Sequence, residues 1–153
     1  MRIYLPATVT ELGDPDGLVA RVVHAVTPAL RAALPDEDEE GLEFAAQLLA
    51  ADDSLDLLGE RPDAPLRRVV VAADVPQEAV APLADDDAAP SAVRLLTAVP
   101  WSDVACAHVD EVAAAEDVTA ALAGDEDAAD RLADRDLLWF DVGELARLAA
   151  GHE

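Results

Sequence analysis

Three aspartates and one histidine stand where an α/β protein would be expected to bind a ligand. Asp74, Asp110 and Asp141 each directly follow a segment that reads as a strand, and His108 comes two residues before Asp110. If those strands are parallel neighbours, the carboxylates collect at the carboxyl edge of the sheet, where open α/β sheets bind ligands. Together with Glu111 they could hold Mg²⁺ or Mn²⁺, which could activate water or position a phosphate ester.

The same aspartates also have ordinary structural explanations. An Asp at a strand–helix junction accepts backbone N–H bonds as a helix cap, which is worth about 0.5–2 kcal/mol. Asp74 precedes Val-Pro, a common turn. With 33 acidic residues among 153, three aspartates after strands are close to what chance gives. The metal-dependent hydrolase is therefore the alternative hypothesis rather than the preferred one.

The single cysteine and the two tryptophans complete the residues of chemical interest. Cys106 and His108 would share one face of a strand, which permits a nucleophile–base pair, but a cysteine between alanines is more often a small buried apolar residue. Trp101 follows Val-Pro in a turn and is a candidate interface anchor, with partial burial against the sheet edge as the alternative. Trp139 lies between Leu138 and Phe140 and is assigned to the core.

Composition excludes several classes of site. There is no Gly-x-Gly-x-x-Gly fingerprint and no phosphate-binding loop ending in Gly-Lys. All ten basic residues are Arg, so no lysine can form a Schiff base or attach pyridoxal phosphate. One cysteine excludes an internal disulfide framework and every multi-cysteine metal site.

The net charge of −23 has two physical interpretations. An acidic surface keeps a protein soluble and favours a monomer through self-repulsion; alternatively, it attracts a basic protein partner. Direct nucleic-acid binding is excluded as a function, because affinity there comes from Lys and Arg on phosphates. The apolar fraction of 52% also excludes disorder.

Length and targeting signals favour one cytoplasmic domain over residues 1–153. A single core normally closes in roughly 100–150 residues. No apolar run approaches the roughly 20 residues of a membrane helix, and the first residues do not read as a signal peptide.

Periodicity predicts alternating strands and helices. A helix over 38–58 has an apolar stripe of Phe44, Leu48, Ala51, Leu55 and Leu58, with Asp36 and Glu39 as its capping box and Gly59 at its end. Shorter helices are expected at 28–34, 111–123, 126–133 and 142–150, the first, third and fourth capped by Thr27, Asp125 and Asp141. Strands are expected at 2–7, 19–26, 67–73, 92–99, 104–109 and 136–140.

These elements predict an α/β or mixed α+β fold. The uninterrupted Val-Val-Val-Ala-Ala run in 67–73 is typical of a central strand covered on both faces. We expect a mixed sheet of about five or six strands under the long helix, with a mobile loop near 82–90. Residues 75–81 and 99–105 share four of seven residues, which indicates a repeated strand-ending turn.

Several segments together resemble a known family. They are Met1–Thr8, Ala25–Arg31, Arg67–Pro76, His108–Asp110 and Leu137–Phe140. The chain is similar, along nearly its whole length, to a family of short, acidic, uncharacterised proteins from high-GC Gram-positive (actinobacterial) genomes. The resemblance implies a cytoplasmic bacterial protein and supplies no activity or ligand. The hypothesis from the sequence is a non-catalytic protein that binds a basic protein partner, with the metal-dependent hydrolase or phosphoesterase as the alternative.

Overall fold

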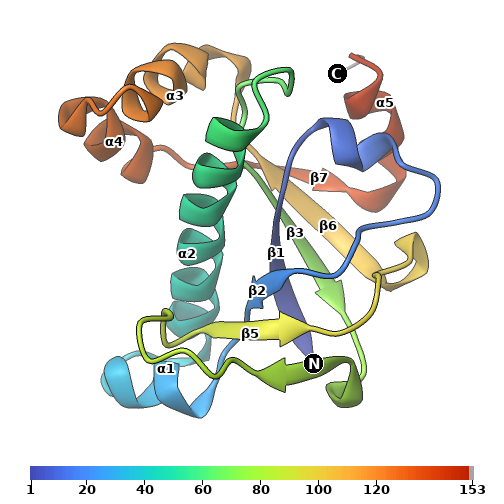
Figure 1. The fold of residues 1–153 in the computed structure, drawn as a ribbon, viewed down its shortest axis with the longest axis vertical. Helices are drawn as coiled ribbons and strands as arrows, with labels where there is room; N and C mark the ends of the chain where they lie inside the picture. Colours follow the sequence, from blue (N-terminus) through green and yellow to red (C-terminus); the bar gives the residue numbers. More distant parts are fainter. Residues whose placement is uncertain (152–153) are drawn as a thin grey trace.

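The computed structural model describes residues 1–151, in which one seven-stranded sheet and five α-helices account for the regular structure (Figure 1). The strand order is β4-β5-β2-β1-β3-β6-β7, and every neighbouring pair is antiparallel. A mixture of strands and helices is thus confirmed. The expected mixed sheet of five or six strands is wrong, both in strand number and in the direction of its strands.

The strands follow the predicted order; β1 and β6 have the predicted bounds, and the other predicted strands differ in length. They are β1 Arg2–Ala7, β2 Val22–His24, β3 Val69–Asp74, β4 Val80–Pro82, β5 Ala92–Leu95, β6 Val104–Val109 and β7 Leu138–Asp141. The extra strand is β4, which has only three residues and ends in proline, so no period-two pattern could develop in it. The β2 strand is much shorter than expected, because the chain before it only makes an isolated bridge from Leu18 to Val99.

The helices confirm the predicted caps at Thr27 and Asp125. They are α1 Pro28–Ala33, α2 Glu39–Glu60, α3 Ala115–Leu122, α4 Glu126–Ala133 and α5 Leu145–Ala149. Thr27 accepts the Leu30 N–H to cap α1, and Asp125 accepts the Ala128 N–H to cap α4. The cap of α2 is Asp38 rather than Asp36, and the helix continues past Gly59 by one residue. Asp141 caps the short 3₁₀ turn that precedes α5.

The long helix α2 packs through only part of the predicted stripe: Ala51 and Leu58 are buried and Leu55 is partly buried, as predicted. Its buried residues are Leu42, Ala46, Ala50, Ala51, Ser54 and Leu58. Phe44 and Leu48 are exposed instead. The small side chains let the helix come close enough for the Ser54 hydroxyl to donate to the Ala7 carbonyl and accept from the Val69 N–H. In a core built largely of Ala, the largest apolar side chains do not mark the buried face.

The two faces of the sheet carry separate layers. The helix α2 packs against β1, β2 and β3 on one face. On the other face, the 3₁₀ segment η1 (Thr10–Gly13) packs with α5 over a core that includes Ile3, Leu5 and Val71 (Figure 1). β3 is buried on both faces from Val69 to Ala73, as its apolar run predicted.

The sheet has one weak seam. β1 pairs with β3 over six residues, but with β2 at a single register position, Tyr4 opposite His24. Arg21 reinforces that seam with its side chain, which donates to the Pro6 carbonyl at 3.0 Å and forms an ion pair with Glu11. Among the helices of residues 1–151, none is long and apolar enough to span a bilayer.

Candidate interaction surface on the β6–β7 side of the sheet

Asp110 is a buried structural carboxylate. Its side chain has no exposed surface and accepts two hydrogen bonds from the Arg68 guanidinium, at 2.8 and 2.9 Å, and one from the Arg68 backbone N–H at 2.9 Å. The same guanidinium donates to the carbonyl of Leu132, the penultimate residue of α4. Asp110 therefore ties β3, β6 and α4 together, and its oxygens are engaged by Arg68.

Of the other three predicted metal ligands, Asp74 lies at the opposite end of the β3–β6 pair from Asp110, while His108 and Asp141 lie on one side of the sheet. Because β3 and β6 are antiparallel, Asp74 ends β3 beside the start of β6, whereas Asp110 follows the opposite end. Asp141 is opposite Cys106, on the side of the sheet that carries His108. The parallel neighbours that the metal hypothesis assumed are absent from the described sheet, and no group of three or more His, Cys, Asp or Glu in residues 1–151 could hold a metal ion.

Asp74 is engaged in an ion pair and His108 is partly buried, and neither environment indicates a metal site. Arg2 donates two hydrogen bonds to the Asp74 carboxylate, which hold its pKa below the usual range. Burial lowers the pKa of His108, and the charge of Arg2 adds to that effect. Both effects favour the neutral form of the imidazole.

Cys106 and His108 do come together, as their spacing indicated. The Cys106 Sγ lies 3.8 Å from the His108 Nε2. Burial raises the pKa of the Cys106 thiol, and a hydrogen bond with Trp139 only partly opposes that rise. Because a cysteine nucleophile needs its thiolate, this neutral pair is poorly suited to covalent catalysis.

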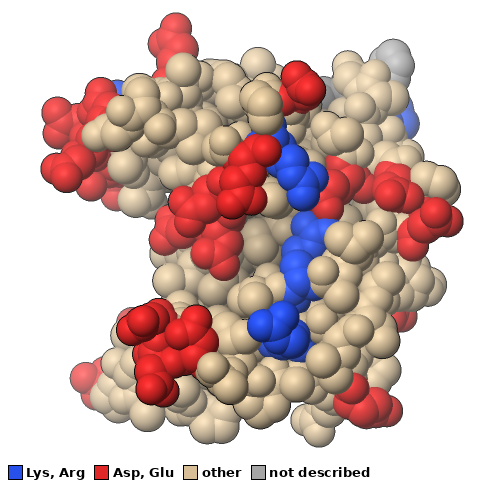
Figure 2. Space-filling view, in the orientation of Figure 1, with Lys and Arg blue, Asp and Glu red and all other residues tan. Residues whose placement is uncertain are grey.

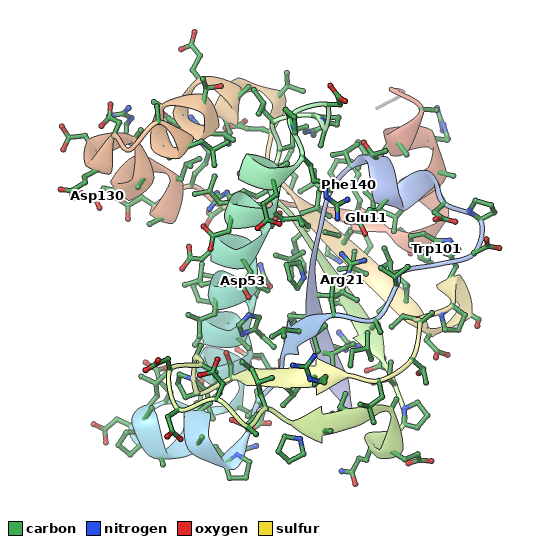
Figure 3. All side chains as sticks on the ribbon, viewed as in Figure 1. Glu11, Arg21, Asp53, Trp101, Asp130 and Phe140 are labelled. Atoms are coloured by element: carbon green, nitrogen blue, oxygen red, sulfur yellow. The ribbon has the colours of Figure 1, made fainter. Side chains whose placement is uncertain are left out.

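Trp101 is partly buried and holds a turn. It opens the 3₁₀ segment η3 (Trp101–Asp103), its indole N–H donates to the Asp14 carbonyl at 2.6 Å, and its ring packs against the core (Figure 3). The turn that it holds is tight, since Gly17 has φ +93° and lies against the Val99 carbonyl. Trp101 therefore has a structural role, whether or not it also contacts a partner.

Trp139 is the exposed aromatic residue, contrary to the prediction that it belongs to the core. Its side chain is 60% exposed. Trp139 pairs with His108 and lies on the face of the sheet that α2 covers, but outside the strands β1, β2 and β3 that α2 contacts. Phe140 points to the other face and packs on the core. Alternation along the strand was correctly inferred, but β7 is an edge strand, and no helix within residues 1–151 buries the face that carries Trp139. We call the exposed residues Leu138, Trp139 and Asp141 the β7 surface.

Further apolar side chains are exposed on α2. Phe44 is 53% exposed, and Leu48 follows one turn later on the same side of the helix. Figure 2 shows acidic side chains gathered over α2, on the lobe formed by α3 and α4, and over the loop between β4 and β5 in front of α1, while a column of Arg side chains runs beside the acidic group of α2. Asp130 on that lobe and Asp53 on α2 are labelled in Figure 3. Exposed apolar side chains are thus set among carboxylates.

Sequence reasoning missed a serine–histidine–aspartate array. His24 Nδ1 lies 2.7 Å from Ser91 Oγ, and its Nε2 lies 2.6 Å from Asp53 Oδ2. In serine hydrolases the nucleophile bonds to Nε2 and faces the substrate. Here the serine is on Nδ1 and is fully buried, and the aspartate is the solvent-facing member. The array joins β2, α2 and the start of β5, and no local pattern signals it, because its members are distant in sequence.

Two of the hollows on the molecule differ in their lining. One, of about 520 Å³, is lined mainly by apolar residues of β4, β5 and the 83–90 loop. The other, of about 760 Å³, lies beside the Arg21–Glu11 pair and is lined by Asp53, Asp56 and Arg61 (Figure 3). Carboxylates and guanidinium groups of the second hollow are close together, so it presents no single charge to a ligand.

The comparisons identify a family without a known role. A family of unknown function, DUF6912, matches residues 1–149. The chain belongs to this family. No curated protein and no solved structure matches it. Membership therefore agrees with the resemblance to an uncharacterised family and assigns no activity to any residue of the DUF6912 chain.

Proposed function

We propose that this DUF6912 protein is a non-catalytic module that binds a basic protein partner through the β7 surface. The observation that carries the proposal is Trp139, a large aromatic side chain that is 60% exposed on an uncovered part of the sheet, in a chain of net charge −23. Tryptophan is enriched among the residues that dominate binding energy. The anchor role that the sequence suggested for Trp101 is better suited to Trp139.

The electrostatics of α2 favour a basic partner. Burial raises the pKa of Asp52 and of Asp56, and Asp53 raises both further, while the charge of Arg68 partly opposes the rise at Asp52. Carboxylates crowded in this way are destabilised by one another at neutral pH. An approaching Lys or Arg side chain relieves that repulsion and speeds the encounter, so association should weaken as salt rises.

Three of the residues considered for chemistry have environments that do not favour catalysis. Asp110 binds Arg68, Ser91 is buried behind His24, and the Cys106 thiol is neutral. The alternative of a metal-dependent hydrolase has no comparable supporting observation, since it requires Asp110 to share one site with Asp74 and Asp141.

We further propose that the protein works as a monomer in the bacterial cytoplasm, in keeping with its charge and the absence of a membrane-spanning helix among the described residues.

The test is to identify a partner and measure its affinity. A photo-crosslinking residue at Leu138 would capture proteins in an extract of the source cells; the captured partner would then be purified and titrated calorimetrically. We expect the Trp139→Ala variant to bind at least about tenfold more weakly, and the wild-type Kd to rise with salt. The matched control is Val112→Ala, which removes a side chain of similar exposure elsewhere.

Two results would contradict the proposal. One is an equal Kd for the Trp139→Ala variant, the Val112→Ala variant and the wild type. The other is a captured partner that is acidic and whose affinity is indifferent to salt. Because Trp139 is mostly exposed, its variant is expected to fold, which circular dichroism would verify.

A further inference from the structure

The outer edge of β7 is an open strand edge. β7 pairs with β6 over four residues, from Leu138 opposite Val109 to Asp141 opposite Cys106. It is the last strand in the order, so no strand within residues 1–151 pairs with its other side. Such an edge presents backbone N–H and C=O groups that can continue the ladder with another chain.

The edge lacks the usual features that prevent strand pairing. Natural edges are blocked by proline, by lysine or other charges within the strand, by bulges or by a covering element. β7 reads Leu-Trp-Phe-Asp, with its only charge at its last residue. Leu138 is 44% exposed and Trp139 60%, and because neighbours in a strand point to opposite faces, apolar surface is available on both sides of the sheet.

The charges around the edge define what can pair with it. The segment 134–144 carries four acids and one Arg: Asp134, Asp136, Asp141, Glu144 and Arg135. Arg135 is already in ion pairs with Glu111 and Asp117. The apolar strand is therefore bracketed by carboxylates at both ends, without an available compensating charge on its own segment.

We propose that an extended segment of a basic protein adds to β7 as an eighth strand. The segment has apolar side chains in its middle, which contact Leu138 and Trp139 on the two faces, and Lys or Arg at both ends, which pair with the carboxylates beside Asp136 and Asp141. This is strand addition, in which main-chain bonds give affinity and alternate side chains give specificity. The inference rests on the proposed function and specifies how the partner binds.

A second copy of the chain fits this edge less well. An antiparallel pairing of two β7 strands would bring the acidic ends of one strand against the acidic ends of the other. Like charges placed together across strands are destabilising. Each chain also brings a net charge of −23 to the interface. Self-association is therefore an outcome that the experiment must be able to show.

The experiment selects peptides from a displayed random library of about twelve residues against the full chain. Enriched sequences should have alternating apolar residues flanked by Arg or Lys. Synthetic copies would be titrated against the protein, and amide hydrogen exchange would locate the contact. We expect the bound peptide to slow the exchange of β7 amides and to leave the exchange of β4 amides unchanged. N-methylation of alternate peptide amides should lower the affinity at least about tenfold.

A pair of matched variants tests the edge itself. Trp139→Lys places a positive charge on β7, and Ala81→Lys places the same charge on β4 at the opposite edge. The first should abolish peptide binding and the second should leave it unchanged. Strand addition is overturned if no peptide is enriched, if N-methylated peptides bind equally well, if the protected amides lie outside β7, or if sedimentation shows that β7 pairs with itself. None of these results would decide whether a basic partner exists, which the crosslinking experiment tests separately.

Discussion

The two halves of the sheet differ in strand length and in how their outer edges end. β1, β3 and β6 have six residues each and pair along their length, whereas β2 and β4 have three residues each. The β4 edge ends in Pro82, which has no N–H to donate. The β7 edge has no proline and exposes Trp139. One edge is thus closed to further strands and the other is open.

The two halves of the sheet are also held by different polar side-chain interactions. The half with long strands is fixed by one buried ion pair, Arg68 with Asp110. The half with short strands meets β1 at one register position and relies on side chains, among them His24 between Ser91 and Asp53. Where the backbone ladder is short, side-chain hydrogen bonds replace it. The following substitutions test that division, starting with the largest expected effect.

Asp110→Asn should be the most damaging of these changes. It keeps the shape of the side chain but leaves the Arg68 guanidinium buried without a counter-charge. Breaking a buried pair in this way typically lowers the free energy of unfolding by about 3–5 kcal/mol. Urea denaturation would measure it, with Asp136→Asn as an exposed control expected to stay within about 0.5 kcal/mol. Equal effects of the two substitutions would mean that the ion pair does not anchor this half.

Ser91→Ala should act on the other half and to a smaller extent. It removes the partner of His24 Nδ1 in a buried site, which costs about 1–3 kcal/mol. Amide exchange should quicken at Val23 and Val93, which pair across β2 and β5, before it quickens at Val71 of β3. Ser102→Ala, on an exposed turn, is the control. Uniform acceleration throughout the sheet would show that the halves are not separable.

The smallest predicted effects have opposite signs for two exposed carboxylates. Arg2 lowers the pKa of Asp74, so this group stabilises the fold above its ordinary pKa and loses that contribution as pH falls. Burial and then Asp53 and Glu60 raise the pKa of Asp56, so its charge opposes folding at neutral pH and the penalty is relieved as pH falls. At neutral pH, Asp74→Asn should destabilise and Asp56→Asn should stabilise the protein. Solvent screening keeps both changes below about 1 kcal/mol.

Urea unfolding at several pH values, repeated at high salt, would measure these two effects. The part of each effect that comes from neighbouring charges should shrink as salt screens them. If the two variants changed stability in the same direction at neutral pH, the assignment of Asp74 as favourably paired and Asp56 as crowded would be wrong.

Local signals predicted the elements well. The caps at Thr27 and Asp125, the bounds of β6 and the burial of β3 on both faces were all inferred correctly, because each depends on neighbours within a few residues. The shared pattern at 75–81 and 99–105 also proves to be one structure, a proline followed by a 3₁₀ turn that leads into a strand, β4 in one case and β6 in the other.

The candidate site was less predictable, because it depends on how strands are ordered. Asp74 and Asp110 each end a strand, and only the antiparallel pairing of β3 with β6 separates them. Trp139 alternates as a core residue would, and only the position of β7 at the edge exposes it. The Ser91–His24–Asp53 contacts join three distant segments and leave no trace in any local pattern.

The sequence by itself determined the acidic charge, the absence of lysine chemistry and of nucleotide motifs, and the alternation of helices with strands, since composition and periodicity act over a few residues. The tertiary structure decided the rest: which carboxylates are buried in ion pairs, which face of α2 meets the sheet, and which aromatic side chain reaches solvent. Those outcomes depend on strand order and on which layer covers each face, and these follow from packing among distant segments rather than from any local pattern.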